Sequence, residues 1–107
     1  DDAILHYRQA IALRDNFAAA HENVGYLLAR QKRFREALEH LEHATSISPK
    51  DPGAWAGLGD VQAVLGALEQ AKASYERALL LQTDGPEATH ARDSLKRLAE
   101  HTKQQRP

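Results

Sequence analysis

The sequence predicts an all-α protein built from a repeated pair of antiparallel helices. Three observations carry this prediction. The 107 residues are 42% hydrophobic and 27% charged, with 6% aromatic residues and only four prolines, a composition that suits a globular helical domain. Apolar residues recur at steps of three and four along most of the chain. The chain also matches itself when it is shifted by 34 residues.

The 34-residue shift aligns small and apolar positions, while most of the polar positions differ. This is the pattern of a common packing scheme with a variable surface. The aligned sets include Ala3, Ala37 and Ala71; Tyr7, Leu41 and Tyr75; Ala10, Ala44 and Ala78; Ala20, Ala54 and Ala88; and Gly25 and Gly59.

Each period is predicted to contain two helices, at about residues 18–30 and 35–46 in the first complete period. Asp51 is a suitable N-cap for the next helix, and Pro52 suits its first turn, where a missing N–H is no loss. Gly66 lies in the turn that follows, where a left-handed residue can end a helix. Lys32 occupies the equivalent turn position, so that turn is either strained by about 1 kcal/mol or has another shape.

The stretch "AWAGLGDVQAVLGALEQAKASYERAL" resembles a tetratricopeptide repeat, and "AAHENVGYLLARQKRFREALEHLEHATSISP" resembles a second copy in phase with it. The resemblance extends from residue 1 to about residue 85. The first stretch matches the signature of the family at Trp55, Leu58, Gly59, Gly66, Leu68, Ala71, Tyr75 and Ala78, and the second at Val24, Gly25, Phe34, Ala37, Leu41, Ala44 and Pro49.

This resemblance implies a right-handed superhelical stack of helix pairs. Residues 1–17 would be the second helix of a truncated repeat, residues 18–51 and 52–85 full repeats, residues 86–103 a capping helix and residues 104–107 a frayed tail. Gly59 and Ala71 would lie at the closest crossing of two helices, and Trp55 would fill the core. The thin apolar stripe of the last helix consists of Ala88, Ala91, Leu95 and Leu98.

In this family the first helices of the repeats line a concave groove that holds a peptide or a partner helix. The resemblance therefore implies a non-catalytic protein-interaction module without a cofactor. Gly53 and Gly57 replace the basic residues that a chaperone-binding carboxylate clamp would need, and they would leave a shallow, mildly apolar trough. The predicted groove residues are Glu22, Asn23, Tyr26, Arg30, Gly53, Ala56, Gly57, Asp60 and Val64.

Other roles remain open from the sequence. One alternative is a structural spacer or oligomerisation segment of a larger protein. The first helix is expected to lack its partner helix, so its face carrying Ala3, Tyr7 and Ala10 predicts weak self-association. The basic stretch "RQKRFR" at residues 30–35 allows nucleic-acid binding. His40 and His43 share one helical face and allow metal binding, but the repeat phase places both on an outward, solvated face.

Enzyme chemistry has little support, because "GLGDVQ" lacks the third glycine of a dinucleotide-binding fingerprint. The formal net charge is −1, and the sequence has no cysteine, no methionine, no apolar run of membrane-spanning length and no signal-peptide pattern. We therefore expect a fragment of a longer protein that is soluble and cytoplasmic, with the partner left unidentified.

Overall fold

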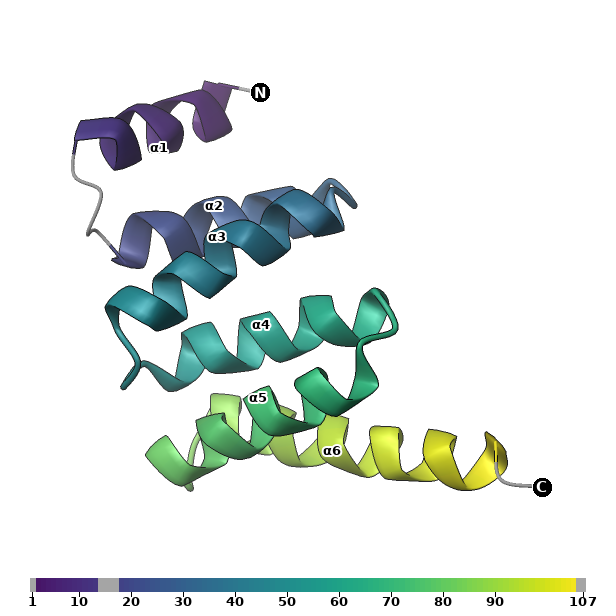
Figure 1. Ribbon diagram of the computed structural model, residues 1–107. Coiled ribbons are helices and arrows are strands. Elements are labelled where there is room, and N and C mark those ends of the chain that lie inside the picture. The colour runs from purple at the N-terminus through teal and green to yellow at the C-terminus, as the bar shows by residue number, and fades with distance from the viewer. Residues whose placement is uncertain (1, 14–17, 106–107) are drawn as a thin grey trace.

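The computed structural model describes residues 2–13 and 18–105, and these residues form six helices that pack pairwise. Figure 1 shows them stacked from α1 at one end of the molecule to α6 at the other. The all-α prediction is confirmed. The helices are α1 (Asp2–Leu13), α2 (Ala18–Arg30), α3 (Phe34–Ile47), α4 (Pro52–Val64), α5 (Leu68–Leu81) and α6 (Pro86–Gln105).

The helix boundaries follow local chemistry that is visible in the sequence. The Asp51 carboxylate accepts a hydrogen bond of 3.0 Å from the Gly53 N–H and caps α4, as predicted, with Pro52 in the first turn. Gly66 ends α4 with a φ of 83°, and Lys32 takes the same left-handed conformation after α2 with a φ of 63°. Of the two outcomes expected for Lys32, the structure has the strained left-handed turn.

The core consists of two apolar clusters joined by Trp55. The first cluster is centred on Val24, Leu28 and Leu41, which are fully buried, and the second on Tyr75. Trp55 packs against both clusters but is only half-buried; its indole N–H donates to the Pro49 carbonyl at 2.8 Å, and the Arg77 guanidinium lies 5.7 Å from the ring centre. The tryptophan thus connects the clusters at their edge instead of filling the core.

Glycines in α2 and α4 permit a large side chain of the following helix to lie against the backbone. A methyl group on Gly59 would lie 2.9 Å from the Tyr75 ring, and one on Gly25 would lie 2.7 Å from the Leu41 side chain. These pairs are one 34-residue period apart. Ala71 is fully buried, but the close approach that needs Gly59 is made by Tyr75.

The helices at the two ends pack through narrow apolar contacts. Among residues 2–9 of α1, whose side chains the structure describes, Ile4 is buried, although the sequence did not indicate it. Ala3 is exposed, Tyr7 is half-buried and the Ala10 side chain lies outside the described residues. On α6 the predicted stripe faces inward, with Ala88 and Ala91 buried and the other members half-buried. None of the helices in the described parts of the chain combines the length and apolar character that crossing a membrane requires.

Candidate functional site

An open cavity of about 590 Å³ lies between α2, α4 and α6, the alternate helices of the stack. Residues of α2 form one wall, the start and middle of α4 form the floor, and the start of α6 forms the other wall. The lining residues are Glu22, Tyr26, Asp51, Pro52, Gly53, Ala56, Gly57, Asp60, Gln82, Pro86, Glu87 and His90.

The cavity includes most, but not all, of the predicted groove residues. Glu22, Tyr26, Gly53, Ala56, Gly57 and Asp60 line it together. Asn23, Arg30 and Val64 are exposed and lie outside this lining.

Sequence reasoning missed the wall that α6 contributes. A signal for it was present, because the 34-residue shift that places Glu22 on Ala56 places Ala56 on His90. The thin apolar stripe of this last segment predicts a capping helix and does not indicate that its polar face lines a cavity.

Tyr26 covers the part of the cavity floor that the sequence predicted to be an open trough. A methyl group on Gly57 would lie only 2.5 Å from Cε1 of the Tyr26 ring, so the ring rests on the backbone of α4. The Tyr26 hydroxyl lies 2.9 Å from the Gly53 carbonyl oxygen and 2.7 Å from Glu22 Oε2. The expectation of a mildly apolar trough at Gly53 and Gly57 is therefore wrong, since Gly57 makes room for this tyrosine of the preceding repeat and Gly53 lies beside the carboxyl groups of Asp51 and Glu22.

Glu22 lies beside a second carboxylate, and this raises its affinity for a proton. Burial, together with the hydrogen bond to Asp51 and the charge of Asp51, raises the pKa of Glu22 to about 7, while the hydrogen bond with Tyr26 opposes the rise. Burial also raises the pKa of Tyr26, as do the hydrogen bond to Glu22 and its charge. At neutral pH this corner of the cavity therefore holds a carboxyl group that a nearby charge can switch between its two protonation states.

Asp60 connects the floor of the cavity to α5 and α6. Its Oδ1 accepts a hydrogen bond from the Tyr75 hydroxyl and lies 2.8 Å from Nε2 of His90. The pKa of Tyr75 is raised by burial and then by this bond to Asp60. The imidazole of His90 also meets the Tyr75 ring edge-on, with ring centres 6.1 Å apart. Asp60 thus fixes the orientation of the His90 ring at the cavity wall.

The cavity is acidic. Its lining contains the carboxylates of Glu22, Asp51, Asp60 and Glu87. Among the described lining residues there is no lysine or arginine, and His90 is the side chain that can add a positive charge.

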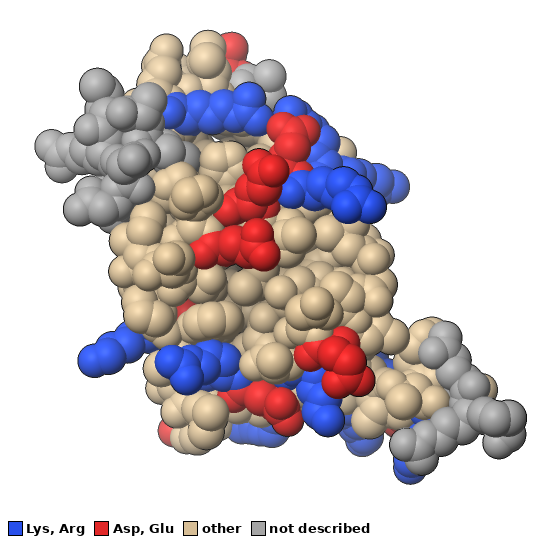
Figure 2. Space-filling model, in the orientation of Figure 1, with Lys and Arg blue, Asp and Glu red and all other residues tan. Residues whose placement is uncertain are grey.

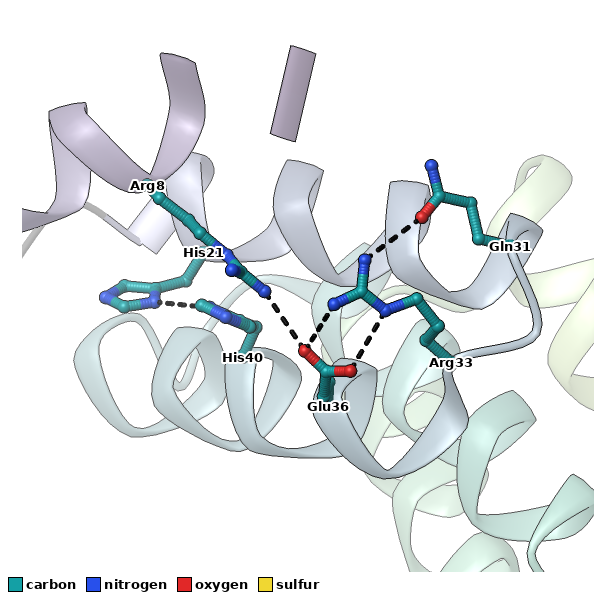
Figure 3. Close-up of polar contacts among 6 residues, drawn as sticks. All are labelled: Arg8, His21, Gln31, Arg33, Glu36 and His40. Atoms are coloured by element: carbon teal, nitrogen blue, oxygen red, sulfur yellow. Dashed lines mark hydrogen bonds and ion pairs between the residues drawn. The ribbon is translucent and has the colours of Figure 1, made fainter. Parts of the chain in front are cut away.

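The basic stretch at residues 30–35 lies on another part of the molecule and is partly paired. Arg33 donates to both oxygens of Glu36, at 2.9 and 2.8 Å, and Arg8 of α1 donates to the same carboxylate at 3.0 Å (Figure 3). The hydrogen bond from Arg33, followed by its charge and by the same contributions from Arg8, holds the pKa of Glu36 below its usual range. On the face where α3 and α5 lie nearest the viewer, acidic side chains form a line with basic groups beside it (Figure 2). Mixed charge of this kind does not make the continuous basic surface that phosphate binding favours.

His40 and His43 are not simply side chains on a solvated face, as the sequence suggested. His40 is half-buried, and its Nδ1 lies 3.3 Å from Nδ1 of the buried His21 (Figure 3). The ring of His43 stacks on the ring of His21, with centres 4.9 Å apart. The repeat phase did not reveal this because the contact depends on how α2 sits beside α3. Within the described residues no group of three or more His, Cys, Asp or Glu side chains is placed to hold a metal ion.

Comparison with known sequences identifies larger proteins with similar segments. The chain is 39% identical over 64 residues to Superkiller protein 3 of Schizosaccharomyces pombe, which covers 60% of this chain and 5% of that protein. It is 33% identical over 84 residues to the Tetratricopeptide repeat-containing protein trd-1 of Caenorhabditis elegans, a match that covers 78% of this chain and 11% of that protein. It is 32% identical over 72 residues to the human Protein O-mannosyl-transferase TMTC3, covering 67% and 8%. The chain thus spans only a small part of the length of these relatives.

Several solved structures of TPR domains have the same fold. The Arabidopsis OM64 TPR domain superposes with a TM-score of 0.82 at 26% identity, covering 92% of this chain and 78% of that one. The first TPR domain of human RPAP3 superposes with a TM-score of 0.84 at 26% identity, covering 94% and 76%. The first TPR of Spaghetti (RPAP3), bound to the HSP90 peptide SRMEEVD, has a TM-score of 0.85 at 24% identity, covering 92% and 76%.

Family assignment rests on the sequence. Models described as "Tetratricopeptide repeat" match residues 28–95 and residues 1–52, so together they extend over most of the chain. The first match includes the whole of α3, α4 and α5, and the second includes α1, α2 and α3. The chain belongs to the tetratricopeptide repeat family.

Proposed function

We propose that the chain is a non-catalytic protein-interaction module that holds an extended segment of another protein in the cavity between α2, α4 and α6. The observation that carries this proposal is the cavity itself, which is open, about 590 Å³ in volume and lined by three alternate helices. Stacked helical repeats characteristically form extended concave surfaces of this kind for binding. Two structural neighbours support the class of ligand, since these RPAP3 domains are in complex with HSP90 and HSP70 peptides.

The side chains around the cavity suit a peptide ligand. Tyr26 lines the cavity with a ring whose hydroxyl is held at the Gly53 carbonyl, and aromatic residues in fixed positions are frequent anchors of binding energy. On the opposite wall, His90 of α6 is held in place by Asp60 of the cavity floor. Asn23, exposed on α2 beyond the lining, has an amide that can both donate to and accept from a peptide backbone.

A binding role also agrees with what the polar groups of the cavity do. Asp60 accepts from Tyr75 and His90, and the Tyr26 hydroxyl bonds across α2 and α4. The bond between Asp60 and Tyr75 joins the two helices of one repeat, while the Tyr26 and His90 contacts join helices of successive periods, so their first effect is to fix the shape of the cavity. Any catalytic activity of a longer protein, such as the transferase named among the relatives, would then belong to other parts of its chain.

An unbiased peptide-display screen with a matched pair of variants tests the proposal. Glu87 lines the cavity on α6, whereas the exposed Glu100 lies on the same helix outside the cavity lining. Glu87→Trp should lower the affinity for the selected peptides by about tenfold or more, because the indole would fill space at the cavity wall. Glu100→Trp should bind the same peptides with an affinity within about twofold of that of the wild type.

Two results would overturn the proposal. One is an equal loss or no loss in both variants, because the cavity would then not be the site. The other is a screen that selects no peptide, which would favour the spacer or oligomerisation role.

A further inference from the structure

We propose that the segment held in this cavity is basic and places a lysine or arginine side chain against the carboxylates of Glu22 and Glu87. This inference rests on the proposed peptide-binding role and names the chemical class of its ligand. The carboxylates lie on opposite walls, with Asp51 and Asp60 between them along the start and middle of α4. A side chain entering from solvent therefore meets a carboxyl group on each of the three helices that form the cavity.

The acidity of the cavity does not reflect the charge of the whole chain. The sequence contains 14 lysine and arginine residues against 15 aspartate and glutamate residues. The arginines whose contacts are established serve elsewhere: Arg8 and Arg33 bind Glu36, and Arg77 lies over Trp55. On α6, Arg92 donates to the Thr83 carbonyl and Arg97 to the Ser94 hydroxyl. No lysine or arginine is among the described residues that line the cavity, and a cleft lined by one sign of charge concentrates ligands of the opposite sign.

The carboxylates of the cavity are incompletely neutralised by the protein. Asp60 has His90 and the Tyr75 hydroxyl as partners. Glu22 is bonded to the Tyr26 hydroxyl, which also lies beside the Gly53 carbonyl, and its other partner is the carboxyl group of Asp51. A hydrogen bond between two carboxyl groups needs a proton on one of them, so no positive charge balances this pair. An ammonium or guanidinium group bound beside Glu22 would take the place of that proton with charge-assisted hydrogen bonds.

The charge of the cavity is the opposite of what an acidic ligand requires. The HSP90 peptide SRMEEVD, bound to the RPAP3 domain that shares this fold, ends in acidic residues. The same peptide in this cavity would place its acidic end among Glu22, Asp51 and Asp60, where like charges disfavour binding. The fold is shared, but the lining of this chain selects the other sign of charge.

Protonation of Glu22 gives a second readout that a purely structural role would not produce. Burial and Asp51 raise the pKa of Glu22 to about 7, and a bound cation would lower it again. Binding should then release a proton near neutral pH, and affinity should rise from about pH 6 to about pH 8. The other titratable groups facing this region are Tyr26 on α2, Asp60 on α4, and Glu87 and His90 on α6.

The test uses one neutral host peptide from the unbiased screen with lysine, glutamine or glutamate at its central position. Isothermal titration calorimetry compares the wild type, the Glu22→Gln/Glu87→Gln variant and a control, Glu69→Gln/Glu100→Gln. The control changes the net charge equally at exposed positions outside this cavity. We expect the lysine peptide to bind the wild type and the control about tenfold more tightly than the glutamine peptide, and the cavity variant to lose this preference.

The possible results separate this inference from the proposed function. Equal or tighter binding of the glutamine or glutamate peptide would overturn the inference while leaving a peptide-binding cavity. A lysine preference that persists in the cavity variant would also overturn it, because the selecting charge would lie elsewhere. Failure of every peptide to bind would overturn the proposed function itself. For the lysine peptide, a rise in affinity with pH that Glu22→Gln abolishes supports the inference.

Discussion

The ring of Tyr26 rests on the backbone of Gly57, so close that a methyl group on Gly57 would lie 2.5 Å from Cε1 of the ring. Two residues later, Gly59 receives the ring of Tyr75 from α5. Positions two apart lie on nearly opposite sides of a helix, so α4 is held between tyrosines from α2 and α5. This arrangement explains why a buried helix contains glycines that weaken it locally: they allow the neighbouring helices to approach.

Gly57→Ala should therefore destabilise the protein, although alanine is the better helix former. The gain in helix propensity is about 1 kcal/mol, whereas overpacking against a ring bonded to both Glu22 and Gly53 costs about 1–3 kcal/mol. We expect a net loss of about 1 kcal/mol, measured by urea denaturation.

A double-mutant cycle identifies the cause of that loss. Tyr26→Ala removes the ring that Gly57→Ala would meet, so the alanine should be tolerated much better in the Tyr26→Ala background. If Gly57→Ala costs the same in both backgrounds, the contact with Tyr26 is not what requires glycine.

Lys32→Gly should stabilise the protein by about 1 kcal/mol, because Lys32 has a φ of 63° that glycine adopts without strain. The matched variant is Gly66→Ala, one period later, where φ is 83° and no atom lies within 4 Å of the added methyl. Its expected effect is a loss of similar size from backbone strain alone. Thermal denaturation of both variants checks this pair, and a Lys32→Gly protein that melts below the wild type would contradict it.

Glu22 should make stability depend on pH in the direction opposite to a salt-bridged carboxylate. Its pKa rises from 4.5 to about 7 on folding, so between these values the folded state holds a proton that the unfolded state has lost. The stabilisation that this proton uptake contributes is fully present below about pH 4.5 and decreases as the pH rises to about 7. Above that pH the contribution of Glu22 no longer changes. Glu22→Gln should flatten this slope and raise stability at about pH 8 by roughly 1 kcal/mol, allowing for solvent screening at a half-exposed site.

Urea denaturation across this pH range measures the effect, and Glu100→Gln is the control on an exposed position. An identical pH slope in the wild type and in Glu22→Gln would show that Glu22 does not take up a proton on folding.

His40 should produce the reverse trend in mildly acidic solution. Burial lowers its pKa below 6.5, and the charges of His21, Arg8 and His43 lower it further, while Glu39 opposes them. The folded state therefore favours neutral His40, and the stability it contributes above pH 6.5 is lost as pH falls through the lowered pKa. His40→Gln should lessen the acid sensitivity, whereas His6→Gln on the exposed face of α1 should preserve it. Equal acid sensitivity in wild type and His40→Gln would contradict this assignment.

The repeat period explains how much of the fold could be predicted. Residues 18–30 were expected to be helical and form α2, and residues 35–46 lie within α3. The Asp51 cap and the left-handed turn at Gly66 also follow from local rules, whereas at Lys32 the same rules leave a strained left-handed turn and another shape as alternatives. These features depend on neighbours close in sequence or on the 34-residue phase, both of which are visible without a structure.

The candidate site was less predictable because its details depend on side chains from different repeats. The placement of Tyr26 over Gly57 and the packing of His40 against His21 depend on how neighbouring helices sit side by side, which the phase alone does not fix. His90 had a signal in the phase but lay in a segment with weak similarity to the signature. Ile4 is buried against the first core cluster although its flanking alanine and leucine are exposed.

The proposed occupant of the cavity between α2, α4 and α6 is a basic segment of a partner protein. The most direct measurement is a two-dimensional NMR titration of the isotope-labelled chain with the lysine peptide. We expect the largest changes in amide chemical shift at Gly53, Gly57 and His90, and we expect these changes to be lost in the Glu22→Gln/Glu87→Gln variant. Shifts confined to residues 30–35 or to the surroundings of Trp55, with these cavity amides unchanged, would contradict it.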